Sequence, residues 1–327
     1  MIQIIDNTLT AFDHCLPSRE DLHAFSTMLF SIGVDIVEVS VTAYERMKPL
    51  PEHKKFALNI EYVEVIDQYP GFYRYICHNG KNNENIIQQI QLNDAREIVK
   101  LRAFNNCKEF RIVGLDDLIC GSYDKTMREI KNSLPRSRVY FCPENNYGCA
   151  SALAVQWILM EGHNITTSFA GVKNNAATEE VLMALRLVMR HKPNRDLSAL
   201  PHLTKLFEDI TGCKIGNKKP VIGKNIFKVE AGIHADGISK NPLTYEAYDP
   251  RCVGGKTELV IGKHSGLKAI KYKMQELKMQ LPMDRIIEKI LGRVKETCTE
   301  KRTSLSDKDF KKLAIEVIAN ERDQIYR

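Results

Sequence analysis

The stretch QIIDNTLTAFDHCLPSREDLHAFSTMLFSIGVDIVEV, residues 3–39, contains an apolar β-branched run, a helical pattern and a second apolar run. It predicts strands at Gln3–Ile5 and Asp35–Val39 and a helix at Arg19–Ser31. Ser18 stands where a helix N-cap is expected, and acidic residues follow it in the first turn. A strand–helix–strand unit of this kind is typical of a parallel sheet with crossover helices.

The same alternation continues to about residue 190. Further strands are predicted at Phe56–Asn59, Arg74–Cys77, Ile86–Gln91, Phe110–Gly114, Arg138–Cys142 and Ile165–Phe169. Further helices are predicted at Asp94–Asn105, Tyr123–Asn132, Ala150–Met160 and Thr178–Arg190. The strands together predict an α/β fold, a (β/α)8 barrel of the TIM type. Because the fourth connection, HNGKNNE, is too short for a helix, we expect a lean, degenerate barrel. A doubly wound open sheet is the alternative, but no glycine-rich phosphate-binding turn follows the first strand.

The composition changes after the barrel, and three parts are predicted. We expect the barrel over residues 1–192, a helix and a Gly/Lys/Pro-rich linker over 193–226, and a mainly helical C-terminal subdomain over 227–327. In this subdomain, FKVEAGIHADGISKNPLTYEAYDP (227–250) is rich in Gly, Asp and Pro and predicts a segment built of loops. Helices are predicted to follow at Ser265–Lys278, Met283–Lys301 and Ser306–Asn320.

The composition argues against several classes of protein. Hydrophobic residues make up 43% of the chain and charged residues 27%, so a large core can form and general disorder is excluded. Lys and Arg number 47 against 41 Asp and Glu, a net charge of +6, and the densest basic runs are KNSLPRSR and GNKKP. Nucleic-acid-binding proteins usually concentrate such charge in a stripe, so we expect no nucleic-acid partner.

The chain also lacks the signals of export and of membrane insertion. No apolar run approaches about 18 residues, and the N-terminus MIQIIDNTLT has no basic region before an apolar one. We therefore expect no membrane contact and a cytoplasmic location. The 9 cysteines are odd in number and include no C-x-x-C pair, so reduced and mostly buried thiols are expected.

Residues suited to chemistry are densest between Glu230 and His264. The run GIHADG places His234 between two glycines, which can bring a backbone close to a ligand. Tyr245 follows in NPLTYE. A lone His or Tyr in a loop is more often a surface or capping residue, but this concentration favours a functional segment.

The run AGIHADGISKNPLTYEAYDPRCVGGKTELVIGKHSG (231–266) resembles the linker and C-terminal subdomain of the homocitrate synthase and 2-isopropylmalate synthase family. The resemblance extends to the terminal helices and to AATEEVLMALRL (176–187), and is faint from Ile60 to Ser133. It implies a metal-dependent (β/α)8 barrel that condenses acetyl-CoA with a 2-oxo acid, after which water releases CoA. The length leaves no room for the regulatory domain of isopropylmalate synthases, which favours the homocitrate synthase branch.

The family's metal-site signatures are altered in this sequence. Where D-T-T-L-R-D-G-E-Q is usual, the chain reads DNTLTAFDH, with Thr10 at the Arg position and Ala11 at the metal-binding acid. Where H-x-H-N-D-x-G supplies two imidazoles, CPENNYG places Cys142 and Glu144. Only Asn175, in AGVKNN, matches a ligand position. Because Mg²⁺ and Mn²⁺ prefer oxygen ligands, we expect no catalytic metal in this chain.

The C-terminal motif, by contrast, is intact. In family dimers the His of G-I-H and the Tyr of T-Y-E, here His234 and Tyr245, reach into the barrel of the other subunit. The chain thus resembles the omega-type subunit of split homocitrate synthases. That resemblance implies an alpha-type partner that supplies the Mg²⁺ or Mn²⁺ and binds 2-oxoglutarate, while His234 and Tyr245 act as catalytic residues on acetyl-CoA. The product, homocitrate, would suit nitrogenase cofactor assembly.

Two alternatives stay open. The chain could be a stand-alone acyltransferase or lyase of altered chemistry that uses Cys142, Glu144 or His14. It could instead be a non-catalytic relative that stabilises or regulates a paralogue.

Overall fold

The computed structural model describes residues 2–78, 84–104, 106–121, 123–192 and 194–325. It divides into two compact units, Met1–Gly223 and Lys224–Arg327. None of the helices in the described ranges is long and apolar enough to cross a bilayer.

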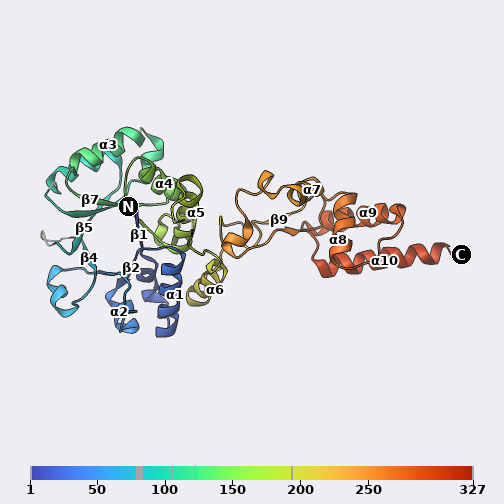
Figure 1. Ribbon diagram of the computed structural model, residues 1–327, viewed down its shortest axis with the longest axis horizontal. Coiled ribbons are helices and arrows are strands. Elements are labelled where there is room, and N and C mark those ends of the chain that lie inside the picture. Colours follow the sequence, from blue (N-terminus) through green and yellow to red (C-terminus); the bar gives the residue numbers. More distant parts are fainter. Residues whose placement is uncertain (1, 79–83, 105, 122, 193, 326–327) are drawn as a thin grey trace. The chain divides into compact units, whose positions relative to one another are not determined.

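The first unit is a closed barrel of eight parallel strands in sequential order (Figure 1). The strands are β1 (Gln3–Asp6), β2 (Ile36–Ser40), β3 (Phe56–Asn59), β4 (Arg74–Cys77), β5 (Ile86–Leu92), β6 (Glu109–Gly114), β7 (Arg138–Pro143) and β8 (Asn164–Thr167). The barrel closes where β1 pairs with β8, in the register Gln3 opposite Asn164. Both the TIM-type barrel and the strand assignments are confirmed.

Helices and 3-10 turns surround the barrel strands (Figure 1). The α-helices of this unit are α1 (Arg19–Ile32), α2 (Val41–Met47), α3 (Tyr123–Ser133), α4 (Ala150–Leu159), α5 (Thr178–Met189) and α6 (Leu200–Thr211). The 3-10 segments are η1 (Thr8–His14), η2 (Val63–Gln68), η3 (Ala95–Phe104), η4 (Asp116–Cys120) and η5 (Phe169–Asn174). Ser18 caps α1 as predicted, since its side chain accepts a hydrogen bond from the backbone N–H of Asp21 at 3.1 Å.

Two details differ from the prediction or lie outside it. The helix expected at 94–105 is a 3-10 helix over its described part, η3. The helix α2, which was not predicted, begins directly after β2 because Ser40 accepts a hydrogen bond from the backbone N–H of Ala43 at 2.9 Å. Residues 79–83, which form most of the connection expected to lack a helix, lie outside the described residues.

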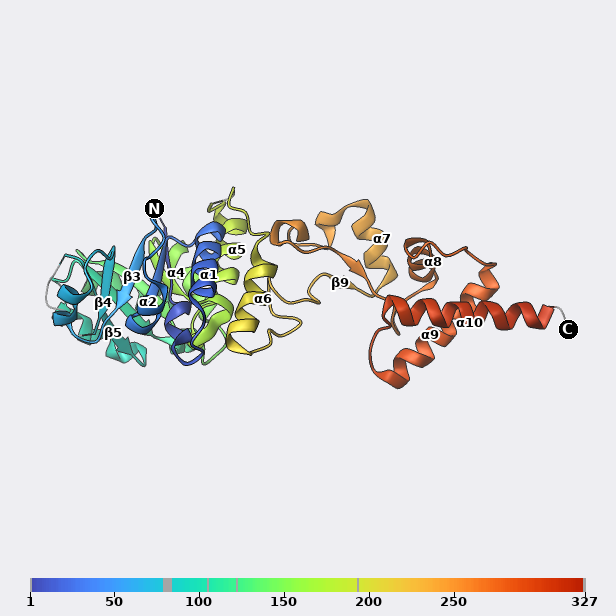
Figure 2. The same cartoon turned by 90° about the horizontal axis from the view of Figure 1, so that it is seen from below.

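A cluster of aromatic rings fixes α6 to the barrel unit. The Phe12 ring packs on that of Phe25 at 5.1 Å between centroids, and Phe25 packs on Phe169 at 5.8 Å. Phe207 of α6 completes the cluster, 5.6 Å from Phe169. Figure 2 shows α6 beside α1. This helix therefore belongs to the first unit and is not part of a free linker.

The second unit is mainly helical, as predicted. It contains β9 (Lys228–Val229), α7 (Gly232–Lys240), η6 (Pro242–Thr244), η7 (Pro250–Val253), β10 (Glu258–Leu259), α8 (Leu267–Glu276), α9 (Asp284–Lys301) and α10 (Asp307–Ile325). The strands β9 and β10 pair in parallel. The helices α8, α9 and α10 bury a core that includes Ile270, Met274, Ile290, Val294 and Phe310.

The prediction that residues 227–250 form only loops was wrong, because Gly232–Lys240 forms the helix α7. One of its glycines serves close packing and does not mark a turn. A Cβ on Gly237 would lie 2.0 Å from the ring of Tyr245, whereas one on Gly232 would lie 3.4 Å from Ala269 of α8, an ordinary van der Waals distance. The missing side chain of Gly237 thus lets the Tyr245 ring pack against α7.

Candidate functional site

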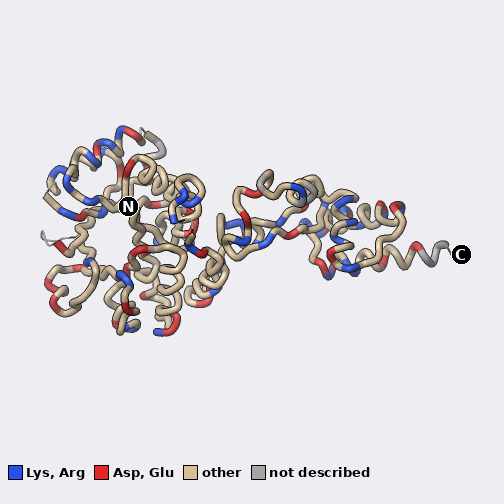
Figure 3. Tube along the Cα trace, in the orientation of Figure 1, with Lys and Arg blue, Asp and Glu red and all other residues tan. Residues whose placement is uncertain are grey.

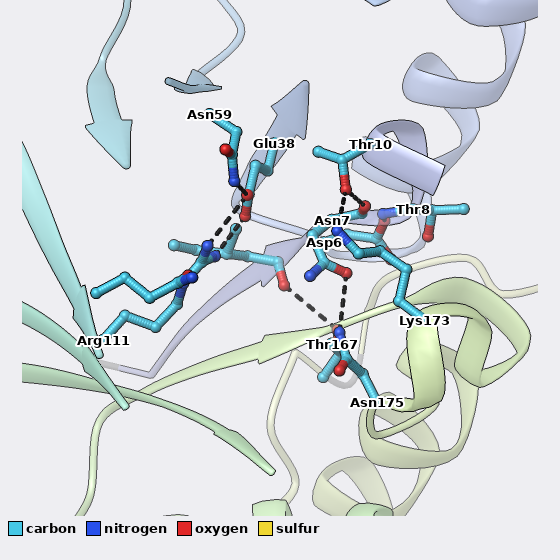
Figure 4. A network of polar contacts seen from close by, with 12 residues as sticks. Asp6, Asn7, Thr8, Thr10, Glu38, Asn59, Arg111, Thr167, Lys173 and Asn175 are labelled. Atoms are coloured by element: carbon cyan, nitrogen blue, oxygen red, sulfur yellow. Dashed lines mark hydrogen bonds and ion pairs between the residues drawn. The ribbon is translucent and has the colours of Figure 1, made fainter. Parts of the chain in front are cut away.

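Polar side chains fill the end of the barrel at which the strands finish, called the mouth here (Figure 4). Active sites of TIM-type barrels lie at this end. Asp6 ends β1, Asn59 ends β3, and Glu38 and Arg111 point into the barrel from β2 and β6.

The central feature of the mouth is an ion pair between Glu38 and Arg111. Their side chains are 0% and 3% exposed, and Arg111 Nη2 donates to Glu38 Oε1 at 3.1 Å. Asn59 Nδ2 also donates to Glu38 Oε1, at 2.7 Å, and Arg111 Nε donates to Gln89 Oε1 at 2.5 Å. Burial acts to raise the pKa of Glu38, but the Arg111 charge and the hydrogen bonds from Arg111 and Asn59 hold the pKa below its usual range. The pair is therefore ionised and crosses the barrel.

Asp6 is fully buried beside this pair. Its Oδ1 accepts from the backbone N–H of Thr8 at 2.9 Å, and its Oδ2 accepts from Thr178 Oγ1 at 2.5 Å. Burial raises the pKa of Asp6 to about 6. Both carboxylate oxygens are thus held by the protein.

We predict that Asp6→Asn stabilises the protein at neutral pH. The folded state of the natural chain binds the Asp6 proton more tightly than the unfolded state, so stability from this group is present at low pH and lost as pH rises towards 6. A shift from the usual value to about 6 corresponds to about 3 kcal/mol. Denaturant unfolding at pH 4 and pH 7 measures the effect, and a variant whose advantage does not grow between these pH values would contradict it. Asp196→Asn is the control, because hydrogen bonds from Ser198 lower the pKa of that carboxyl.

The loops after β1 and β8 meet across the mouth. Lys173 Nζ donates to Thr10 Oγ1 at 2.7 Å, and Asn175 Nδ2 donates to Asn7 Oδ1 at 3.3 Å (Figure 4). Lys173 therefore brings an ammonium group to the mouth beside Thr10, and its charge acts to lower the pKa of Glu38.

The backbone that carries Lys173 is unusual. Ala170, Gly171 and Lys173 have φ values of 58°, 73° and 63°, in the left-handed region that non-glycine residues rarely adopt. Glu179, buried below, accepts a hydrogen bond from the backbone N–H of Ala170 at 2.9 Å. Burial raises the pKa of Glu179 to about 7, and Lys219 Nζ lies 3.8 Å from its Oε1. This contact helps to hold the loop in its strained form.

The loops after β6, β7 and β8 are also joined to one another. The backbone N–H of Asn145 donates to Asn174 O at 2.8 Å, and Asn174 Nδ2 donates to Asn146 Oδ1 at 2.8 Å. Asn146 Nδ2 in turn donates to Asp116 Oδ2. The polar groups in this part of the mouth therefore form hydrogen bonds with one another.

The residues that the sequence singled out in the barrel lie around the same mouth. Cys142 is buried in β7, and burial raises the pKa of its thiol to about 12, so the sulfur is protonated at neutral pH. Glu144 and Asn175 pair through an isolated antiparallel bridge. His14 is exposed at the end of η1.

His234 and Tyr245 lie together in the second unit. Their ring centroids are 4.9 Å apart and the ring planes are tilted by 40°. His234 is in the first turn of α7, and Tyr245 follows η6 with 45% of its surface exposed. Beside them Ile233 is 79% exposed. The structure brings the predicted pair into contact, while its catalytic role stays a prediction.

Sequence reasoning missed Glu38, Arg111 and Lys173. A signal for the first two was present, since each is a charged residue inside a β-branched strand run, VDIVEV and EFRIVG. A charge at such a position is buried and needs a partner. No sequence pattern indicates that Lys173 meets Thr10.

The residues beyond Tyr245 have a structural role around Glu230. Glu230 Oε1 accepts from the backbone N–H of His264 at 2.8 Å, and its Oε2 accepts from Ser304 Oγ at 3.3 Å. A Cβ on Gly262 would lie 2.3 Å from Glu230 Oε1. The GKHSG segment is therefore built to enclose this carboxylate.

Three comparisons with known proteins bear on these units. The family "Homocitrate synthase post-HMGL domain-like" matches residues 221–302. The omega subunit of homocitrate synthase from Clostridium pasteurianum is 31% identical over 284 residues, which cover 80% of each chain. The homocitrate synthase AksA of Methanothermobacter thermautotrophicus is 32% identical over 173 residues, 51% of this chain and 44% of that protein. Among solved structures, hydroxymethylglutaryl-CoA lyase from Pseudomonas aeruginosa covers 65% of this chain and 94% of its own, with a TM-score of 0.52 and 16% identity.

Proposed function

Since the chain belongs to the homocitrate synthase family, we propose that it is the omega-type subunit of a split homocitrate synthase. In this proposal it donates His234 and Tyr245 to the barrel of an alpha-type partner. The pair of subunits would convert acetyl-CoA, 2-oxoglutarate and water into homocitrate and CoA. A C–C bond forms between the acetyl methyl carbon and the oxo carbon, and hydrolysis of the thioester releases CoA.

The observation that carries this proposal is that the side chains of the barrel mouth are not free to bind a metal ion. The family's reaction implies a divalent metal, Mg²⁺ or Mn²⁺, which needs several free oxygen ligands. Here both oxygens of Asp6 accept hydrogen bonds, Glu38 is paired with Arg111, and the Cys142 thiol is protonated. The Lys173 ammonium adds a positive charge. The residues present do not fit the metal.

The other described parts of the chain offer no ligand set for a metal either. Within the described ranges, no three or more His, Cys, Asp or Glu side chains gather closely enough to hold a metal ion. We therefore assign the metal and the oxo-acid pocket to the partner and derive no metal-dependent step in this chain.

The second unit supplies the imidazole and the phenol that such a partner would lack. His234 and Tyr245 are exposed and in contact, and the exposed Ile233 beside them provides apolar surface that could be buried against another barrel. Imidazole accepts protons near neutral pH, which suits removal of the acetyl methyl proton. The phenol can donate a hydrogen bond to the developing enolate oxygen. Insertion of this segment would also exclude water from the reacting thioester.

We expect the purified chain alone to show no condensation of acetyl-CoA with 2-oxoglutarate. Co-expression with a homologous barrel from the same genome, one with intact Arg-Asp and His-x-His motifs, should give an active hetero-oligomer. Release of free CoA and size-exclusion chromatography with mass detection measure the two outcomes. Turnover by the lone chain above about 1 per second would contradict the proposal. Full activity of the partner without this chain would instead support a regulatory role.

A further inference from the structure

A cavity of about 910 Å³ opens at the end of the barrel opposite the mouth. Its lining comes from the starts of the strands: Gln3 begins β1, Arg138 begins β7 and Asn164 begins β8. Asp35 and Lys55 stand directly before β2 and β3. The cavity therefore lies within the first unit and is separate from the polar network of the mouth.

Basic side chains dominate the rim of this cavity. The cations are Lys54, Lys55, Lys131, Arg136, Arg138 and Arg195, against the carboxylates of Asp35 and Glu161. Lys192 Nζ contacts both oxygens of Asp35 at 2.7 Å and neutralises that carboxylate. Basic and acidic residues are otherwise interspersed along the trace (Figure 3). It is the closure of the barrel that gathers cations from distant segments, including the KNSLPRSR run, around one opening.

Several of these cations have no carboxylate to neutralise them. Lys54 Nζ lies 5.3 Å from the Phe30 ring centroid and Lys55 Nζ 4.5 Å from that of Tyr73, and neither forms an ion pair with a described carboxylate. Arg138 contacts Glu109 at 3.3 Å, but two shorter hydrogen bonds from Arg74 already hold that carboxylate. Cation–π contacts hold the lysine side chains without cancelling their charge. The opening therefore carries a positive potential.

One wall of the cavity is held rigidly by the packing around Trp157. Trp157 is 2% exposed, and its Nε1 donates to Asn164 O at 3.0 Å. A Cβ on Gly162 would lie 2.4 Å from the Trp157 ring, so this turn tolerates no side chain there. Lys131 Nζ lies 5.9 Å from the same ring centroid and donates to Met160 O. This wall is thus fixed before any ligand arrives.

We propose that this cavity binds a phosphorylated small molecule of nucleotide size. Lys and Arg are the side chains that recognise phosphate groups, and the rim offers more of them than one phosphate needs. The volume is in the range of small-molecule sites, about 300–1,000 Å³. The inference is independent of the proposed subunit role, since it uses none of the residues assigned to it.

Titration calorimetry of the full chain with ATP, tripolyphosphate and adenosine, without added divalent cations, tests the proposal. We expect ATP to bind saturably, at least as tightly as tripolyphosphate, and adenosine not to bind. Affinity for ATP should fall as salt rises. The double variant Lys54→Glu/Arg136→Glu should weaken ATP binding about tenfold or more, because both exposed cations line the rim. If the double variant does not fold, Arg136→Gln replaces it in the test. This single variant should also weaken ATP binding.

Lys125→Glu is the control for a single charge reversal, since it makes the same change as each of the two substitutions on a side chain of α3 that is 74% exposed and outside the cavity. It should leave ATP binding unchanged. Absence of saturable ATP binding up to about 1 mM would overturn the proposal. An equal loss of binding in Lys125→Glu would do so too. Binding of tripolyphosphate without ATP would overturn the nucleotide size of the ligand. Binding of an acidic peptide in place of ATP would show a protein-docking surface instead.

Discussion

Replacing His234 by Ala is expected to lower kcat of the assembled two-subunit enzyme by about 10²–10⁴-fold, the usual contribution of a positioned general base. The imidazole lies 4.9 Å from the Tyr245 ring, on an exposed part of the second unit. The substitution removes no buried contact, so assembly and the affinity for 2-oxoglutarate should be nearly unchanged. Initial rates of CoA release by the variant mixed with natural partner give kcat, and size-exclusion chromatography gives assembly.

Tyr245→Phe separates catalysis from packing at the same place. Phenylalanine keeps the ring that fills the space left by Gly237 and loses only the hydroxyl. If the two groups serve one proton transfer, the double variant should lose less activity than the product of the single losses.

The controls for this pair come from the same unit. Tyr248→Phe removes a hydroxyl from a ring that packs on Phe227 at 5.7 Å, and His264→Ala removes an imidazole from a residue held through its backbone N–H. Neither should change kcat. Equal kcat for the natural and His234→Ala complexes would show that this segment only clamps the subunits together.

The strands were predictable because each is a short β-branched run between helical patterns, a local signal that tertiary packing then reinforces. The helix α7 was not predictable in this way. Its glycines at 232 and 237 suggested a loop, yet Gly237 leaves the space that the Tyr245 ring fills. A glycine required by a packed side chain looks the same, in the sequence, as a glycine that breaks a helix.

The two parts of the candidate site also differ in how far they could be predicted from the sequence. His234 and Tyr245 are close in the sequence and carry a recognisable motif, so they could be named together. Glu38 and Arg111 are 73 residues apart, and only the closure of the barrel brings β2 and β6 opposite each other. The sequence marked each as a charge within an apolar strand but did not pair them.

That pairing leads to the largest expected effect on stability. Arg111→Met should lower the free energy of unfolding of the barrel unit by about 3–5 kcal/mol, because it leaves the Glu38 carboxylate buried without a counter-charge. The hydrogen bond from Asn59 does not replace the lost charge. Trp157, the sole tryptophan of the chain, lies in α4, so urea unfolding followed by its fluorescence reports on this unit.

The double variant Glu38→Leu/Arg111→Met distinguishes the cost of an unpaired charge from the loss of packing. It removes both charges, so it should recover most of the stability lost in the single variant. Arg138→Met is the control on the neighbouring strand, since this arginine is 52% exposed beside Glu109 and its loss should cost less than about 1 kcal/mol. If Arg111→Met costs no more than Arg138→Met, the buried pair does not hold the barrel mouth together. In that case Glu38 must take up a proton in the variant, and stability should then rise as the pH falls.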